Sequence, residues 1–299
     1  MKNNKNLVTL SQKEGGLIYS IVSVLPYLIM FVVVAVLIVA DKEYSTKSYY
    51  TYITYLIPQI ASLTALIYIC MRKKTSVITL CSVKRTSPVY LGLGVVLIVG
   101  LLFGVGYFNE LFVTFLESVG LGLTVPSVPN SSPVQFVLSL IIIGVLAPVL
   151  EELIFRGAIL NSLNGLKTYQ SLILGGVLFA LFHQNPAQLL YQGIVGACLT
   201  YLALKSGSVL PSVVAHLFNN LFIIITNAYF SGVEFYNIYT IVIGLILFAL
   251  SLLGIYFYSK KTAQNPPEQK RIFDIKGFYI GAIAGVLFNL TLIITTLFM

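Results

Sequence analysis

Long apolar segments divide this chain of 299 residues, and they constrain its fold more than any other feature. A helix needs about 20 apolar residues to cross the hydrocarbon core of a bilayer. The fifth to seventh candidate segments are short and closely spaced, so counts of eight and nine both fit. The sequence therefore predicts an all-α, polytopic bundle of eight or nine transmembrane helices, near residues 17–40, 50–71, 89–108, 134–156, 167–184, 187–205, 208–229, 237–258 and 277–299.

The composition supports a membrane protein, because 58% of the residues are hydrophobic and only 9% are charged. A soluble domain averages roughly 25% charged residues. The first apolar segment is too long for a signal peptide, so we expect a retained helix. The three cysteines, Cys70, Cys81 and Cys198, are widely spaced and form no CxxC pair, which predicts neither a disulfide framework nor a structural zinc site.

The net charge of +8 has a distribution that indicates membrane topology rather than binding to nucleic acid. Basic residues cluster in short loops beside apolar segments, as the positive-inside rule describes. With nine spans and a cytoplasmic N-terminus, all but Lys42 and Lys47 of the 18 basic residues face the cytoplasm. We therefore predict a multi-pass protein of the cell membrane with its N-terminus in the cytoplasm and Met299 at the outer face.

Three parts are predicted along the chain. Residues 1–133 hold three spans and an outer loop at 109–133, which contains no Lys or Arg. Residues 134–229 form a core that carries polar side chains within apolar sequence. Residues 230–299 add the C-terminal spans.

Four ionisable side chains lie within membrane-grade sequence: Glu151, Glu152 and the only two histidines, His183 and His216. Such groups cost on the order of 2.5–3.5 kcal/mol each at the centre of an inserted helix, and they usually mark function. The region from 151 to 216 is therefore predicted to build a polar site inside the membrane.

The first motif is Glu151-Glu152-x-x-x-Arg156. On a helix, Glu152 and Arg156 share a face and can pair. Glu151 points about 100° away, so it is free to face a cavity. A carboxylate removed from water suits a general base. The alternative is an ordinary charged helix end at the cytoplasmic interface.

The other two motifs are Phe179-x-x-x-His183 and His216-x-x-x-Asn220. His183 ends an apolar segment and could simply cap a helix C-terminus. His216 and Asn220 lie one turn apart in mid-span, where interhelical hydrogen bonding is the alternative role. The helical rise places Glu151 and these three side chains at depths of roughly 10 to 22 Å from the cytoplasmic interface, which allows one shared site.

A glutamate with two histidines fits two kinds of hydrolysis. In one, Glu151, His183 and His216 hold a zinc ion that activates water, although the sequence has no HExxH motif. In the other, Glu151 and His183 activate water directly, while His216 and Asn220 stabilise the oxyanion. A donor of that kind contributes roughly 10²–10³ in rate.

Together and in this order, the three motifs between about 134 and 229 resemble the CPBP family of CAAX proteases and bacteriocin-processing proteins, also called Abi proteins. The resemblance implies an intramembrane endopeptidase. It implies that Glu151 is the general base, that His183 holds the water, and that His216 and Asn220 form the oxyanion site. Glu152 and Arg156 would keep the site assembled.

The same resemblance guides the expected cofactor and substrate. The family is often labelled metalloprotease, yet its eukaryotic prenyl-protein endopeptidase resembles a glutamate-dependent enzyme, so we expect no required cofactor, with zinc as the alternative. The expected substrate is a peptide or membrane protein that enters from the lipid bilayer or the cytoplasm of a bacterium. Relatives are associated with bacteriocin self-immunity and peptide maturation.

Two rival functions belong to other classes. The polar cluster could fix helix packing in a non-catalytic immunity or scaffold protein. Intramembrane ionisable residues also mark transport pathways. Transport is disfavoured, because the sequence has no paired halves with matching broken helices.

Overall fold

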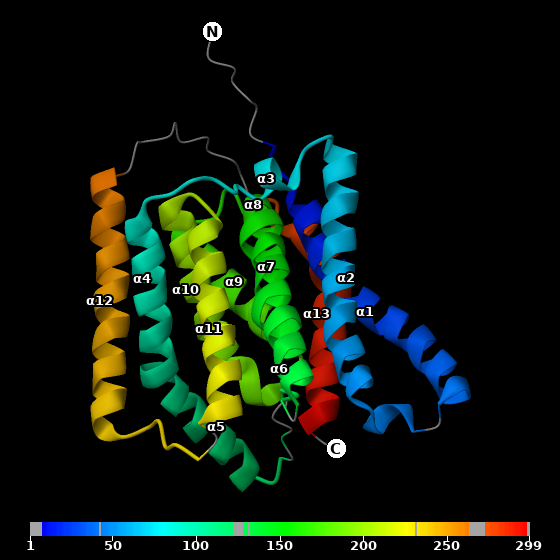
Figure 1. Cartoon of the computed structure of the whole chain (residues 1–299). Coiled ribbons are helices and arrows are strands. Elements are labelled where there is room, and N and C mark those ends of the chain that lie inside the picture. The colour runs from blue at the N-terminus through cyan, green and yellow to red at the C-terminus, as the bar shows by residue number, and fades with distance from the viewer. Residues whose placement is uncertain are drawn as a thin grey trace.

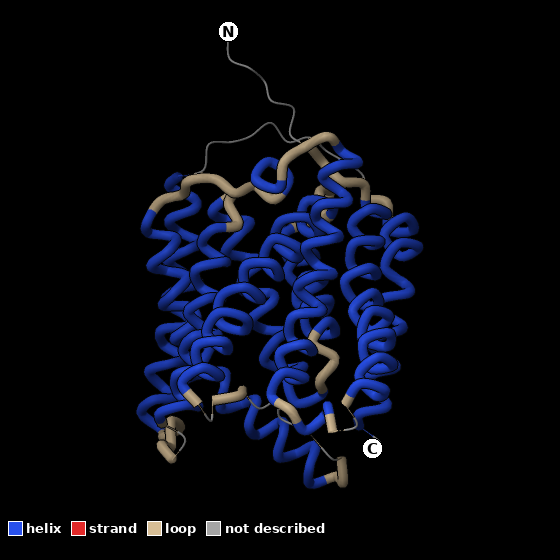
Figure 2. The backbone as a smooth tube through the Cα atoms, turned by 45° about the vertical axis from the view of Figure 1, so that its right-hand side comes forward, coloured by secondary structure: helices blue, strands red, loops and turns tan. Residues whose placement is uncertain are grey.

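In a computed structural model, the structure describes residues 8–41, 43–121, 123, 128–130, 132–230, 232–262 and 273–297. Within these residues the secondary structure is helical and contains no β-strand (Figure 2). A helix satisfies its own backbone hydrogen bonds, which hydrocarbon cannot do. Several positions used in the topology prediction lie outside the described residues, namely Lys2, Lys5, Lys42, Lys270, Arg271 and Met299.

Most of the long described helices run nearly parallel or antiparallel to one another, whereas α1 (Gln12–Ala40) and α5 (Gly106–Ser118) run obliquely (Figure 1). In chain order the described helices are α1 (Gln12–Ala40), η1 (Tyr44–Thr46), α2 (Ser48–Lys73), α3 (Val77–Leu80), α4 (Pro88–Gly100), η2 (Leu101–Val105), α5 (Gly106–Ser118), α6 (Pro133–Ser139), η3 (Leu140–Leu146), α7 (Ala147–Glu152), η4 (Leu153–Ile159), α8 (Leu160–Ser162), α9 (Thr168–Phe182), η5 (Pro186–Gln188), α10 (Leu189–Ser206), α11 (Leu210–Tyr229), α12 (Ile238–Thr262) and α13 (Ile275–Leu297).

Eight continuous helical stretches of the described chain are long and apolar enough to cross a membrane. Three of them combine several labelled elements, over Pro88–Ser118, Pro133–Ser162 and Pro186–Ser206. Helix α9 is also apolar but has only 15 residues, which is short for a full crossing. The predicted all-α, multi-pass bundle is therefore confirmed, and its count depends on how α9 is treated.

The predicted outer loop at 109–133 is wrong over its first part, because α5 continues as a helix to Ser118. The apolar residues Leu111, Phe112 and Phe115 keep helical spacing past the polar pair Asn109-Glu110. Asn109 is itself an anchor: its amide donates to the Ala187 carbonyl at 3.1 Å and accepts from the Tyr191 backbone N–H at 3.2 Å. Positions 122, 124–127 and 131 of the predicted loop lie outside the described residues.

Basic residues occur in the last turns of α2, α10 and α12. All three helices end on the side of the bundle where α1 begins, at the top of Figure 1. One side of the molecule thus gathers positive charge, as the positive-inside pattern requires. The cytoplasmic location of that side remains a prediction.

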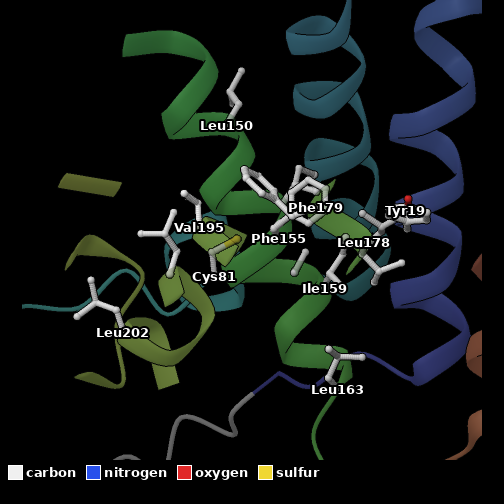
Figure 3. Packing of buried hydrophobic residues seen from close by; sticks show 14 of the residues in the cluster. Tyr19, Cys81, Leu150, Phe155, Ile159, Leu163, Leu178, Phe179, Val195 and Leu202 are labelled. Carbon is white, nitrogen blue, oxygen red and sulfur yellow. The ribbon is translucent and has the colours of Figure 1, made fainter. Parts of the chain in front are cut away.

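The apolar core joins α1 to the central helices. Figure 3 shows Phe155 and Phe179 at the middle of the buried cluster, with Leu178 and Tyr19 beside them. The Phe155 ring centroid lies 5.1 Å from that of Phe179 and 6.4 Å from that of Tyr19. This packing fixes η4 against α9 and α1, and so fixes the helix that carries the glutamates.

Helices α1 and α13 lie close together although they are at opposite ends of the chain. A Cβ atom on Gly281 would lie 2.4 Å from the Lys13 carbonyl oxygen, so only glycine allows this approach. Ser20 Oγ donates to the Gly281 carbonyl at 2.7 Å. Small residues commonly permit such contacts between membrane helices. Helix α12 packs on the η2 part of the α4–α5 helix in the same way, where a Cβ on Gly244 would lie 2.4 Å from Gly104 N.

We expect Gly281→Ala to lower the stability of the protein by about 1–3 kcal/mol, because the added methyl group overlaps backbone of α1. Gly92→Ala is the matched control, since a Cβ on Gly92 meets no atom within 4 Å and alanine favours helix. Thermal unfolding in detergent would compare the two variants. Equal unfolding temperatures would contradict the tight α1–α13 contact.

Candidate active site

The two adjacent glutamates lie at the end of α7, between the π-helical segments η3 and η4. Wider π-helical turns frequently occur at functional sites in helices. The side chains of the pair diverge: Glu152 is fully buried, whereas Glu151 lines a cavity. The predicted division between a paired and a cavity-facing carboxylate is confirmed in the structure.

Glu152 forms the predicted ion pair and a second contact. Its Oε1 lies 2.7 Å from Arg156 Nη1 and 2.9 Å from His216 Nδ1. A carboxylate can only accept, so the Nδ1–H of His216 is the donor. Glu152 therefore holds the imidazole of α11 in a fixed orientation, with Nε2 on the opposite side of the ring.

Arg156 connects the carboxylate to two further helices. Its Nη2 donates to the Gly196 carbonyl on α10 at 3.0 Å. Its guanidinium carbon lies 4.3 Å from the centroid of the Phe179 ring on α9, a cation–π contact. Arg156 is only 4% exposed, so these contacts form away from water.

Glu151 has no hydrogen bond to any residue that the structure describes. Its Oε2 lies 3.9 Å from His216 Nε2, which is beyond hydrogen-bonding distance. The side chain is 12% exposed and borders the cavity. This carboxylate is thus close to an imidazole but available to a bound molecule.

His183 is a helix cap and also lines the cavity. It ends α9, where its backbone N–H donates to the Ala180 carbonyl at 3.2 Å. Its ring Nδ1 lies 2.8 Å from the Phe179 carbonyl oxygen, which can only accept, so Nδ1 carries a proton. The side chain also lines the cavity. Capping therefore orients the ring and leaves Nε2 without a described partner.

Asn220 lines the cavity within a short hydrogen-bonded chain. Its Nδ2 donates to the Ile143 carbonyl in η3 at 3.0 Å, and its Oδ1 accepts from Asn219 Nδ2 at 3.1 Å. Asn219 in turn accepts from the Tyr191 hydroxyl at 2.9 Å. Sequence reasoning missed Asn219, whose only signal was its place beside Asn220, and Tyr191, which lies in no motif.

A cavity of about 650 Å³ brings the predicted residues together. Glu151, His183, His216 and Asn220 all line it, although they come from two helices, α7 and α11, and from the C-terminal end of α9. Glu152 and Arg156 do not line it and lie behind His216. The cavity also has walls from α1 and α2, such as Ser23, Tyr27 and Gln59, which the motifs did not include.

The alternative zinc site requires Glu151, His183 and His216 to converge on one point. Among the described residues, no three His, Cys, Asp or Glu side chains gather closely enough to hold a metal ion. The donor set as arranged here therefore does not fit a three-ligand metal centre. In both histidines Nδ1 is hydrogen-bonded, to the Phe179 carbonyl in His183 and to Glu152 in His216, so only Nε2 of each ring is left for a bound molecule.

A second polar network supports the segment that follows His183. Gln184 adopts a left-handed backbone conformation with φ of 52°, which is uncommon for a residue with a side chain. Its amide contacts Tyr27 on α1 and Asn289 on α13. Asn289 is fully buried and also donates to the Tyr19 hydroxyl at 2.8 Å and Ser23 Oγ at 3.0 Å. The outer helices thus hold the turn beside a cavity-lining histidine.

We expect Asn289→Leu to destabilise the protein by about 1–3 kcal/mol, because it leaves buried polar partners without hydrogen bonds. The matched control is Thr291→Val, since the Thr291 hydroxyl bonds only to the Leu287 carbonyl of its own helix. Thermal unfolding in detergent measures both. A loss as small as that of the control would show that the network does not hold this turn.

The comparisons with known proteins concern this same core. The family model described as "Type II CAAX prenyl endopeptidase Rce1-like" matches residues 133–222, which is under a third of the chain. The match includes all seven named residues of the three motifs. No significant match was found among curated proteins or among solved structures. The CAAX-protease resemblance is therefore confirmed over residues 133–222, and through this core the chain is similar to a family of membrane proteases, the type II CAAX prenyl endopeptidases.

Proposed function

We propose that this protein is an intramembrane endopeptidase in which Glu151 is the general base. The observation that carries the proposal is the shared cavity. A carboxylate without a described hydrogen-bond partner borders the same space as two oriented imidazoles and an amide. The match to a CAAX protease family supports peptide hydrolysis as the chemistry.

In the proposed reaction, Glu151 takes a proton from a water molecule as the water oxygen attacks the carbonyl carbon of the scissile peptide bond. The carbonyl oxygen becomes an oxyanion. Glu151 then returns the proton to the leaving nitrogen, the C–N bond breaks, and a carboxylic acid and an amine result. His183 Nε2, which has no described partner, accepts a hydrogen bond from the attacking water and holds it in place.

Two donors are proposed for the oxyanion. Asn220 uses one N–H of its amide on the Ile143 carbonyl and has a second N–H for the substrate. His216 donates its Nδ1–H to Glu152, so the group that donates to the oxyanion must be its Nε2–H. The oxyanion role therefore requires protons on both ring nitrogens of His216. Glu152 and Arg156 do not touch the substrate in this scheme and act by positioning His216.

We further propose that the basic side of the bundle faces the cytoplasm and that the substrate is a peptide or a membrane protein. Bacteriocin self-immunity and peptide maturation are the biological roles that fit the family resemblance. No required cofactor is proposed, because the donor set does not converge on one metal position among the described residues.

The test uses the purified full-length protein in lipid vesicles with a library of internally quenched peptides. We expect cleavage, at a rate that is unchanged by a zinc chelator and by added zinc. Loss of cleavage on chelation, with recovery on addition of zinc, would contradict the metal-independent mechanism. Absence of cleavage across the library would favour the non-catalytic immunity or scaffold function.

A further inference from the structure

Besides Gln184, three glutamines line the cavity outside the catalytic motifs: Gln59 on α2, Gln188 in η5 and Gln192 on α10. None of their side chains hydrogen-bonds to a residue that the structure describes. Gln59 is the most constrained, because it is only 6% exposed and its Oε1 is a buried acceptor without a partner. Buried polar atoms are usually paired, and an exception in a cavity indicates a binding group.

Three of the four other carboxamides around the cavity are hydrogen-bonded, and the side chain of the fourth, Asn227, has no described hydrogen bond. Gln184 is bonded to α1 and α13, and Asn219 and Asn220 are bonded to each other and to neighbouring groups. Among the glutamines of the cavity wall, Gln59, Gln188 and Gln192 are therefore the ones whose side chains have no described partner. Gln188 and Gln192 are one helical turn apart on a continuous helix, so they share a face with Cβ atoms roughly 5–6 Å apart.

The cavity wall has little charge. Among its described lining residues, Glu151 is the only carboxylate, and there is no Asp, Lys or Arg. A charged side chain that entered would lose its water, and the described wall offers it no counter-charge apart from the proposed catalytic groups Glu151 and His216. The wall instead offers amides, hydroxyls and apolar groups.

We propose that Gln59, Gln188 and Gln192 bind the backbone of an extended peptide segment that is uncharged around the scissile bond. A carboxamide has an acceptor and donors that match the N–H and C=O of a peptide. In an extended chain, equivalent backbone groups recur every second residue, roughly 6.6 Å apart, close to the spacing of two glutamines one turn apart. The inference rests on the proposed peptidase function and names its substrate class.

The first experiment measures KM and kcat for the best-cleaved uncharged peptide with Gln59→Leu and Gln192→Leu in the full-length protein. Each substitution removes a hydrogen bond made only with substrate, so we expect KM to rise about 3- to 10-fold with kcat within about 2-fold. Gln12→Leu is the matched control, because Gln12 lies at the exposed start of α1 and outside the cavity. Thermal stability without peptide should not fall in Gln59→Leu, whereas a structural role would lower it.

A second series places an N-methyl group at successive backbone nitrogens of the peptide. At the nitrogen that donates to Gln59 Oε1, methylation should raise the KM of the wild-type protein about 3- to 10-fold. The KM of the Gln59→Leu variant should not change. Unchanged KM in all glutamine variants would overturn the proposal. So would equal cleavage of peptides with Lys or Asp beside the scissile bond, which we expect to be cut at least about 10-fold more slowly.

Failure of the inference is distinguishable from failure of the peptidase function. Binding of fluorescent, uncharged peptides to the wild-type protein and the glutamine variants can be measured by anisotropy without any cleavage. If the wild type cleaves no peptide yet binds them more tightly than Gln59→Leu does, the peptidase function fails and the binding site stands. Equal binding by all variants overturns the binding site itself.

Discussion

Glu151→Gln is expected to abolish peptide cleavage while the protein still inserts and folds. Glutamine keeps the size of the side chain but cannot take the proton of the attacking water. General-base catalysis contributes about 10²–10⁴ in rate, so the loss of kcat should fall in that range. The fold should tolerate the change, because no described residue hydrogen-bonds to the Glu151 carboxylate. The measurement is cleavage of the quenched peptide by equal amounts of protein in vesicles.

Glu117→Gln is the matched control, since Glu117 is exposed on α5 and does not line the cavity. It should cleave as the wild type does. The thermal unfolding temperature of both variants should remain near that of the wild type. Cleavage by Glu151→Gln within about 3-fold of the wild-type rate would remove Glu151 from the mechanism, since a general base contributes at least about 10²-fold.

Arg156→Met should produce the largest loss of stability, about 3–5 kcal/mol. After the substitution Glu152 stays fully buried, and His216 is the only described residue that still hydrogen-bonds to its Oε1. The other carboxylate oxygen, Oε2, has no described hydrogen-bond partner even in the wild type. A buried carboxylate without a counter-charge lowers the free energy of unfolding, and methionine replaces only the apolar packing of the arginine side chain. Chemical or thermal unfolding in detergent measures the effect. Lys47→Met is the control, because its pair with Glu43 is exposed and should contribute little.

A double variant separates folding from positioning. Glu152→Leu combined with Arg156→Met removes both charges, and an apolar pair often replaces a buried ion pair without loss of stability. We expect stability to recover in the double variant while cleavage stays low, because His216 then lacks the acceptor that orients its ring. Recovery of both stability and cleavage would show that Glu152 and Arg156 serve packing alone.

The motifs of the site were predictable because each is local. Glu152 and Arg156 are one turn apart, and so are Phe179 and His183, so helical geometry alone places each pair on one face. The high cost of ionisable groups in hydrocarbon then singles out Glu151 and His216. The roles of these residues stay proposals, although the structure confirms the ion pair and the shared cavity.

Local sequence patterns did not predict features of the fold that depend on a contact with a residue far away in the chain. The outer loop was predicted to begin at residue 109, yet Asn109 anchors a continuing helix through Ala187 and Tyr191. The π-helical segments on both sides of α7 also have no sequence signature that we recognised. Both features depend on contacts between segments that are far apart in the chain.

By itself, the sequence determined a helical membrane bundle and a short list of polar residues, because apolar length and helical spacing are properties of single segments. Only the tertiary structure decided which of those residues face a common cavity and which stand behind it. It also decided that α1 and α2, outside the matched core, supply part of the cavity wall, and that α1 and α13 hold the turn after His183. Such arrangements arise from helix–helix packing and buried hydrogen bonds between remote residues, which no single segment encodes.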